Sequence, residues 1–253
     1  MKKEIIKLLR KIEKENNVTV IFAVESGSRL WGISSPDSDY DVRFVYKKKV
    51  KDYLTIRVTP DNISKTEGNI DCVGFDLIKF TKLLKDSNPS CIEWLISDIV
   101  YLGKQPEYFV EYAKTNFNRF KLYYHYKSMC RANYEKYIKS NNMVTYKKYL
   151  YCLRRALNSI WVSNDKRIPI INFSYLVLYL DRNVPIEVID KINELIEQKK
   201  QGNDRTGIER IEVVDAFLEQ FLASDNLERF INSENNISID RLDKEMLKLI
   251  SFW

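Results

Sequence analysis

The chain has 253 residues, 45% of them hydrophobic and 30% charged, which is enough apolar material to bury one large core or two smaller ones. Its low glycine and proline content excludes collagen-like and Pro-rich disordered proteins. The single histidine, His125, excludes metal sites built from several histidines, and the four cysteines form no C-x-x-C pair, which favours reduced, buried thiols over structural zinc. A metal ion bound here would therefore need carboxylate ligands, which favours Mg²⁺ or Mn²⁺.

The sequence shows no signal peptide and no segment that could cross a membrane. The N-terminus carries charges every few residues, and the longest apolar run, 175–180, is far too short to span a bilayer. We expect a cytoplasmic protein without a membrane partner. The sequence does not indicate an oligomeric state.

The first hundred residues alternate between helical and strand patterns. Apolar residues at helical spacing predict a helix over 2–16, and the strict alternation of 39–46 predicts a strand with one buried face. Residues 47–67 carry only a weak pattern. Asp76 stands at the N-cap position of a helix that stops near residue 88. The other expected elements are a buried strand at 18–24, a loop at 32–38, a strand at 70–75 and a short helix at 90–96.

From about residue 106 the patterns are helical. The expected helices cover 119–139, 144–162, 172–181, 185–201 and 208–223. We therefore predict an α+β fold with an N-terminal α/β domain at 1–105 and an all-helical domain at 106–253. Residues 114–155 hold eleven Lys or Arg and one acid, whereas 185–253 hold fifteen acids and nine Lys or Arg. This uneven charge favours one face that meets an anionic partner.

The most informative stretch begins where the strand at 18–24 ends. Glu25-Ser-Gly27-Ser28 is a turn signal, and a glycine there lets the backbone approach a bulky anion closely. The following N–H groups and the Ser28 hydroxyl can hold phosphate oxygens, and Leu30-Trp31 could begin a short helix. This turn therefore predicts a phosphate-binding site.

Two carboxylates follow on the next strand. Asp39 and Asp41 lie on the same face, about 6.5 Å apart along the strand. Such a pair repels itself unless a raised pKa, a basic neighbour or divalent cations neutralise it, and bound Mg²⁺–nucleotide is the simplest answer beside a phosphate turn. Asp71, inside the next apolar strand, can supply a third ligand; its rival Asp76 is explained as a helix cap. Three such acids could hold two metal ions about 3.5–4 Å apart.

A Gly-Ser turn followed by D-x-D on a strand and by a later strand acid resembles the DNA polymerase β-type nucleotidyltransferase superfamily. The resemblance is closest to the YcgL/RlaP-type branch, which is associated with RNA repair. The segments that carry it are ESGSRLWGISSPDSDYDVRF at 25–44, DCVGFDLIKFTKLLKDSNPSCIEWL at 71–95, YHYKSM at 124–129 and YKKYLYCLRRAL at 146–157. It implies a nucleotidyltransferase domain with a small mixed sheet and a C-terminal helical domain that closes a cleft.

The resemblance also implies the roles of individual residues. Gly27 and Ser28, with Arg29, would hold the triphosphate of an NTP, and ATP is the NTP that we expect first. Asp39 and Asp41 would bind both metal ions, and Asp71 would bind the catalytic metal and help to activate the acceptor hydroxyl. Many small relatives carry a second Arg two residues after the one at Arg29, whereas Trp31 stands there in this chain.

Several further residues have two interpretations. Glu25 can be a partner of Arg29 or Arg43, Lys79 can be a phosphate ligand or a solvated lysine, and His125 can be packed or catalytic. On the helix at 144–162, three side chains flank the apolar stripe as residues lining a cleft would: Lys147, Tyr151 and Arg154. The neighbouring Lys148 and Arg155 point away from the core and are expected to be solvated.

These features predict an enzyme that transfers a nucleoside monophosphate from an NTP to an acceptor hydroxyl with two Mg²⁺ ions and releases pyrophosphate. The eleven basic residues of 114–155 alternate with ten aromatic ones, which favours an RNA or tRNA-like end as the acceptor. The alternatives are transfer to a protein or a small molecule, and a non-catalytic nucleotide- or RNA-binding module.

Overall fold

The protein is described from a computed structural model, which describes residues 1–56, 59–203, 205–224, 230 and 239–251. The chain forms two compact units, and neither is continuous in sequence. The first comprises Met1–Leu30, Asp39–Phe117 and Asn235–Trp253, and the second comprises Trp31–Ser38 and Asn118–Glu234. We describe each unit by itself. The assignment of catalysis to one part of the chain and substrate binding to another stays a prediction.

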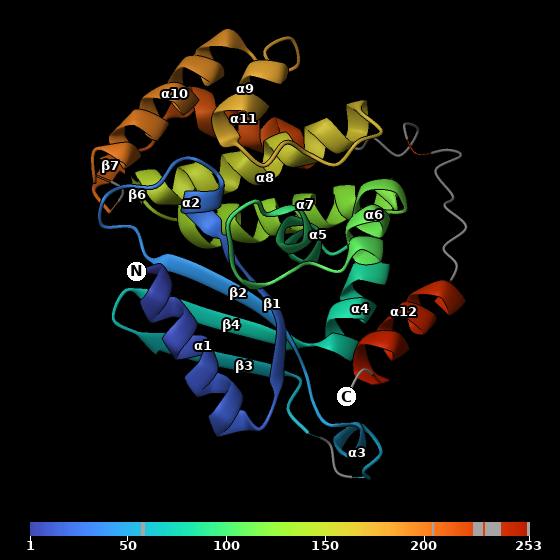
Figure 1. Ribbon diagram of the computed structural model, residues 1–253. Helices are drawn as coiled ribbons and strands as arrows, with labels where there is room; N and C mark the ends of the chain where they lie inside the picture. Colours follow the sequence, from blue (N-terminus) through green and yellow to red (C-terminus); the bar gives the residue numbers. More distant parts are fainter. Residues whose placement is uncertain (57–58, 204, 225–229, 231–238, 252–253) are drawn as a thin grey trace. The chain divides into compact units, whose positions relative to one another are not determined.

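The first unit is built around a mixed sheet of five strands (Figure 1). Its strands are β1 (Thr19–Ser26), β2 (Tyr40–Lys47), β3 (Asn62–Glu67), β4 (Ile70–Asp76) and β5 (Val100–Gly103), in the order β3-β4-β2-β1-β5. The central pair, β2 and β4, is parallel, and the other neighbours are antiparallel. This arrangement confirms the predicted α+β fold and brings the D-x-D strand beside the strand that carries Asp71.

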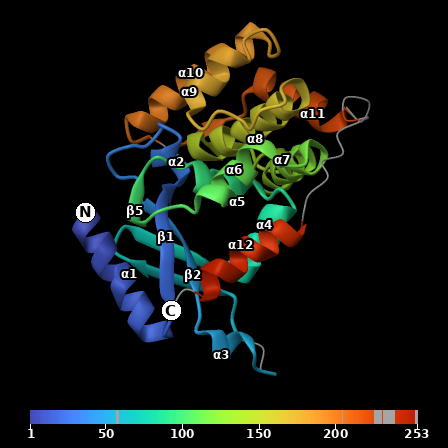
Figure 2. The same ribbon diagram turned by 45° about the vertical axis from the view of Figure 1, so that its right-hand side comes forward.

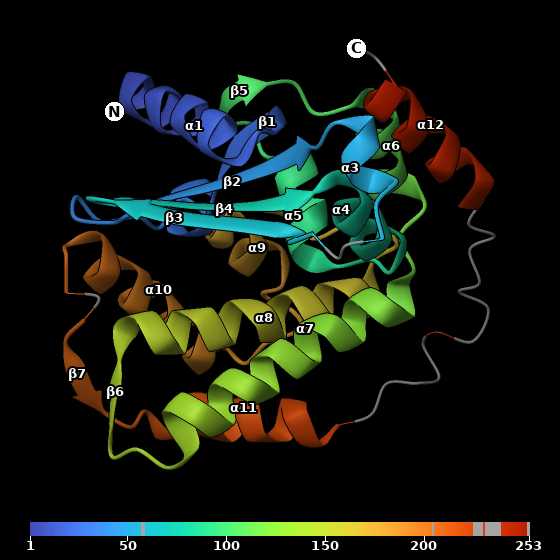
Figure 3. The same cartoon turned by 90° about the horizontal axis from the view of Figure 1, so that it is seen from below.

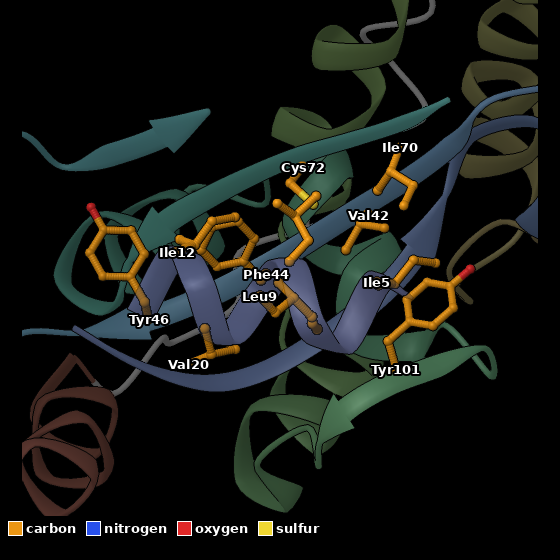
Figure 4. Close-up of a cluster of buried hydrophobic side chains, with 12 residues drawn as sticks. Ile5, Leu9, Ile12, Val20, Val42, Phe44, Tyr46, Ile70, Cys72 and Tyr101 are labelled. Atoms are coloured by element: carbon orange, nitrogen blue, oxygen red, sulfur yellow. The ribbon is translucent and has the colours of Figure 1, made fainter. Parts of the chain in front are cut away.

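Helix α1 (Lys2–Asn16) covers one face of this sheet. Its apolar stripe recurs at helical spacing, so one side of the helix can be buried completely. The stripe packs on side chains of alternate strand positions (Figure 4), since successive residues of a strand point to opposite faces. The buried cluster includes Ile5, Leu9, Ile12, Val20, Val42, Phe44, Tyr46, Ile70, Cys72 and Tyr101.

Helices cover the opposite face (Figure 3). They are α4 (Leu77–Lys85), α5 (Pro89–Ile96) and α6 (Glu107–Thr115). Phe80 anchors this layer, because its ring contacts Phe22 of the sheet at 5.8 Å and Trp94 of α5 at 6.0 Å between centroids. Two single-turn helices, α2 (Gly27–Leu30) and α3 (Val50–Tyr53), follow β1 and β2. Helix α12 (Ile239–Ser251) lies beside α4 (Figure 2).

The second unit is mainly helical. Its helices are α7 (Arg119–Tyr134), a π-helical continuation η1 (Glu135–Lys139), α8 (Tyr146–Asn164), α9 (Phe173–Tyr179), α10 (Ile186–Lys200) and α11 (Glu212–Ala223). The strands β6 (Met143–Thr145) and β7 (Gly207–Glu209) form a short antiparallel pair. Helices α7 and α8 pack together, with the sulfur atoms of the buried Cys130 and Cys152 3.5 Å apart between them.

The structure confirms the long periodic elements of the sequence and adds short ones. The predicted helices and strands are present with shifts of a few residues at their ends, whereas β3, β5, β6, β7, α3, α6 and α12 were not predicted. All four cysteines are buried and free, as expected. In the described part of the chain, no helix combines the length and the apolar character that crossing a bilayer requires.

Candidate active site

The turn after β1 touches the carboxylate of Asp41. Strand β1 ends at Ser26, which lies opposite Asp41 in the antiparallel register with β2. The next residue, Gly27, has a φ of 64°, in the left-handed region that favours glycine. A Cβ atom on Gly27 would lie 2.0 Å from Oδ2 of Asp41. Only glycine therefore fits here, and the predicted phosphate turn and the D-x-D motif form one local structure.

Helix α2 begins at this glycine and ends at Leu30, so the expectation that a short helix starts at Leu30-Trp31 was wrong. The shift is small but places Ser28 inside the turn, where only 4% of the residue is exposed. Arg29 donates from Nε to the carbonyl oxygen of Asp39 at 3.2 Å, and its guanidinium carbon lies 3.9 Å from the centre of the Tyr40 ring. Arg29 thus fastens the turn to the start of β2.

Asp41 and Asp71 lie directly opposite each other on the parallel strands β2 and β4. Arg43 binds both of them: its Nη2 lies 2.9 Å from Oδ1 of Asp41, and its Nη1 lies 3.0 Å from Oδ2 of Asp71. A basic neighbour therefore neutralises Asp41 and Asp71, whereas the sequence favoured bound Mg²⁺–nucleotide as the counter-charge of the D-x-D pair. Asp39 precedes β2 and is exposed.

Glu25 supports the site from inside the sheet. It is completely buried, accepts the backbone N–H of Asp41 at 2.8 Å, and accepts a hydrogen bond from the Tyr101 hydroxyl. Burial raises the pKa of Glu25, and these two hydrogen bonds oppose the rise. The positive charge of Arg29 also opposes the rise in this pKa, which agrees with the interpretation of Glu25 as a partner of Arg29. Tyr101 lies on β5, which has no clear pattern in the sequence.

Asp76 lies at the other end of β4, away from the site. Asp76 caps α4 by accepting the N–H of Ile78 at 3.0 Å, which confirms its predicted role. It lies five positions after Asp71 along an extended strand, or about 16 Å away. Lys79 lies beyond Asp76 and pairs with Asp61 at 2.8 Å. The structure therefore does not bring Lys79 to the carboxylates, and this lysine is half-buried and ion-paired rather than solvated.

The three predicted binding residues of α8 lie in the second unit, around Trp31. The Arg154 guanidinium carbon lies 4.1 Å from the centre of the Trp31 ring, and the Tyr151 ring packs edge-on against it at 5.3 Å. The Lys147 ammonium lies 5.6 Å from the centre of the Tyr151 ring. Arg154 is only 4% exposed and donates to the carbonyl of Ile171. Trp31, noted in the sequence as a departure, is thus the residue on which two of them pack.

Other predictions for this unit had mixed outcomes. His125 is half-buried on α7. Lys148 and Arg155 are half-buried rather than solvated, because Lys148 lies over the Tyr137 ring and Arg155 donates to the carbonyl of Tyr151.

The chemistry of the carboxylates fits a divalent cation. Carboxylate oxygens are ligands that Mg²⁺ takes, and the missing Cβ of Gly27 makes room for an oxygen of Asp41. Among the residues that the structure describes, however, no three acidic, cysteine or histidine side chains gather closely enough to hold a metal ion. Arg43 pairs with one oxygen of Asp41 and one of Asp71, so its guanidinium competes with a metal ion that these acids bind together.

The chain is similar to known proteins along most of its length. Residues 1–247 match the sequence family described as RlaP, the RNA repair pathway DNA polymerase beta family. The chain belongs to this family. It is 35% identical over 246 residues to the uncharacterized protein YcgL of Bacillus subtilis, covering 96% of this chain and 92% of YcgL. It is also 33% identical over 144 residues to the uncharacterized protein MJ0002 of Methanocaldococcus jannaschii, covering 55% and 58% of the two chains.

Among solved structures, a nucleotidyltransferase-like protein from Exiguobacterium sibiricum is similar to this chain, with 11% sequence identity and a TM-score of 0.34. The similarity covers 95% of this chain and 86% of the chain from Exiguobacterium sibiricum. A likeness this low carries no argument about the site. The family match and the α+β fold support a polymerase β-type nucleotidyltransferase. The acceptor and the metal ion are not specified by these comparisons.

Proposed function

We propose that this chain transfers a nucleoside monophosphate from an NTP to a hydroxyl group of an RNA end and releases pyrophosphate. ATP is the preferred NTP in this proposal. Membership in an RNA repair family supports RNA as the acceptor class. The acceptor oxygen forms a bond to the α-phosphorus, the bond from that phosphorus to the bridging oxygen breaks, and pyrophosphate leaves with the electron pair.

The observation that carries this proposal is the contact between Gly27 and Asp41. Phosphoryl transfer needs little covalent chemistry from the protein, so its catalysts position phosphates beside groups that neutralise their charge. Here the turn that can approach a phosphate closely lies against a carboxylate that can hold the counter-ion. A surface acid without this role would not require glycine in a left-handed conformation beside it.

In this proposal the turn and the carboxylates have different tasks. Gly27, Ser28 and Arg29 hold the triphosphate, and Asp39, Asp41 and Asp71 hold two Mg²⁺ or Mn²⁺ ions. Bound divalent cations supply Lewis-acid stabilisation of the charge on the phosphates. Asp71 also accepts a hydrogen bond from the acceptor hydroxyl. Glu25 fixes the backbone of Asp41 through the hydrogen bond to its N–H.

One observation weakens the case for RNA against a protein or small-molecule acceptor. Many basic residues of 114–155 have structural partners, so they are not a free RNA-binding surface. Arg119 donates to the last carbonyls of α8, and Lys127 and Arg131 donate to carbonyls at the end of α11. Arg154 is buried against Trp31. The case for RNA therefore rests on the family and on the remaining basic residues, Lys147 among them.

A transfer assay tests the proposal. The protein is incubated with Mg²⁺ and each of the four NTPs, carrying label on the α-phosphate, together with bulk RNA or with a protein extract free of nucleic acid. We expect label on RNA, one pyrophosphate per transfer, and the strongest signal with ATP. Label on protein alone would identify the alternative acceptor. No pyrophosphate with any NTP and acceptor would leave a non-catalytic binding module.

A further inference from the structure

Backbone and side-chain oxygens of the candidate site fix the position of the Arg43 guanidinium. Besides its ion pairs with Asp41 and Asp71, its Nη1 donates to the backbone carbonyl of Asp71 at 2.9 Å and to that of Val42 at 3.2 Å. Its side chain is 18% exposed, against 25% for Asp41 and 35% for Asp71. The most enclosed charge in this group is therefore the positive one, and four contacts fix its position.

The strand register explains why the guanidinium lies there. Arg43 follows Asp41 by two residues, so both side chains leave β2 on the same face. The parallel pairing sets Asp71 opposite Asp41, one step from Arg43 along the same face. Two carboxylates that face each other across neighbouring strands repel each other. An arginine stays protonated in proteins, so the positive charge of Arg43 always offsets this repulsion. Arg43 is thus a permanent counter-ion of the pair.

Arg43 binds one oxygen of each carboxylate that would hold a divalent cation. Oδ1 of Asp41 and Oδ2 of Asp71 each lie within 3.0 Å of a guanidinium nitrogen. Binding of a metal ion by both acids therefore competes with two ion pairs and brings a divalent charge close to a fixed positive charge. Both effects weaken metal binding, and the second is long-ranged enough to act even after the guanidinium has moved aside.

We propose that Arg43 is a displaceable counter-ion that keeps the affinity of the carboxylates for divalent cations low until a nucleotide arrives. The inference rests on the proposed function and extends it, because it couples the two ligands of the site. A triphosphate gives the released guanidinium a new anionic partner, since arginine pairs well with phosphate oxygens. The metal ion then binds tightly only together with the nucleotide. Arg43 acts here as a positioning residue.

The test is a titration with Mn²⁺ alone, followed by electron paramagnetic resonance, which measures the free ion and requires no turnover. Arg43→Gln removes the charge and keeps a polar side chain. We expect it to bind Mn²⁺ about tenfold more tightly than the wild type, because two partly exposed ion pairs no longer oppose the ion. A non-hydrolysable ATP analogue should tighten Mn²⁺ binding by the wild type but have a smaller effect on Arg43→Gln.

Two further variants control this experiment. Arg10→Gln removes another ion-paired arginine of the same unit, which binds Glu13 at 2.7 Å, and should leave Mn²⁺ binding unchanged. Arg43→Lys keeps the charge and should bind Mn²⁺ nearly as weakly as the wild type. Melting in EDTA shows whether each variant is folded; Arg43→Gln should melt at a lower temperature than the wild type, and excess Mn²⁺ should reduce the difference.

Failure of this inference and failure of the proposed function give different results. If Arg43→Gln and the wild type bind Mn²⁺ equally, while Asp41→Asn abolishes binding, the metal site stands and the role of Arg43 is refuted. Weaker binding by Arg43→Gln would refute it as well. If no variant binds Mn²⁺ even with the ATP analogue, the carboxylates are not a metal site, and both proposals fall.

Discussion

The carboxylate of Asp41 lies where the Cβ atom of any residue but glycine at position 27 would have to be. Gly68 offers a matched comparison, because its φ of 61° is also left-handed but nothing lies within 4 Å of its Cβ position. Both Gly27→Ala and Gly68→Ala should lose roughly 1 kcal/mol of unfolding free energy through backbone strain. Only Gly27→Ala must also displace Asp41, so it alone should lose nucleotidyl transfer. Urea unfolding and the transfer assay measure the two effects, and equal activity in both variants would contradict the close contact.

Asp71 and Asp76 stand at opposite ends of β4 and should respond in opposite ways to the same substitution. Asp71→Asn should abolish transfer and reduce the unfolding free energy by less than about 1 kcal/mol, because its ion pair with Arg43 is partly exposed. Asp76→Asn keeps the helix cap but weakens the contacts with Tyr53 and Lys48, so it should lose roughly 1–2 kcal/mol and remain active. The reverse pattern would assign the third carboxylate to Asp76.

The buried carboxyl group of Glu25 should make the stability of the protein depend on pH. Burial raises its pKa in the folded protein above the ordinary value of 4.5, so the folded state disfavours the charged carboxylate. Its favourable contribution is fully present below pH 4.5 and is lost as the pH rises through the raised pKa. Glu25→Gln lacks this titration. In EDTA, the unfolding free energy of Glu25→Gln minus that of the wild type should therefore increase from pH 4.5 upward and then level off. A difference that is constant with pH would mean that the raised pKa is wrong.

Lys147 and Lys148 are adjacent, equally charged and differently placed. Lys147 belongs to the group around Trp31 and Tyr151, whereas the Lys148 ammonium lies 3.5 Å from the centre of the Tyr137 ring. If α8 contacts RNA through the predicted side chains, Lys147→Gln should flatten the salt dependence of RNA binding by about 0.7 in log–log slope. Lys148→Gln should change it much less. Equal slopes for both variants would indicate a diffuse charged surface.

Arg154 is unsuited to that experiment. The sequence places it on the same stripe as Lys147, but its guanidinium is buried against Trp31. A neutral side chain there would lower the stability of the second unit, so a loss of RNA binding would have two explanations.

The sequence predicted the parts of the fold that local patterns determine. Long apolar periodicities located α1, α8 and α10, and the alternation of β2 identified its buried face, because each pattern repeats over several turns or strand residues. The missed strands β5, β6 and β7 have three or four residues, too few for a period to be visible. Their partners are also distant in sequence.

The site divides in the same way. The turn at Gly27, the acids of the D-x-D motif and the cap at Asp76 follow from neighbouring residues, so they could be predicted. The ion pair between Arg43 and Asp71 depends on the register of two strands that a third strand separates in the chain, and the contact of Trp31 with Arg154 joins residues more than a hundred positions apart. Tertiary pairings of this kind are not encoded in local spacing.

The central claim is that Asp41 belongs to a nucleotidyl-transfer site, and a comparison of Asp41→Asn with Asp215→Asn tests it most directly. Asp215 is also an ion-paired acid, bound by Arg210 at 2.7 Å and by the Tyr149 hydroxyl, but it lies in the core of the second unit. The measurement is transfer of α-labelled nucleotide to RNA, per folded molecule, at a temperature where both variants are native. The account predicts that Asp41→Asn stays folded and transfers nothing, while Asp215→Asn unfolds more easily and transfers at the wild-type rate. Undiminished transfer by Asp41→Asn would contradict it.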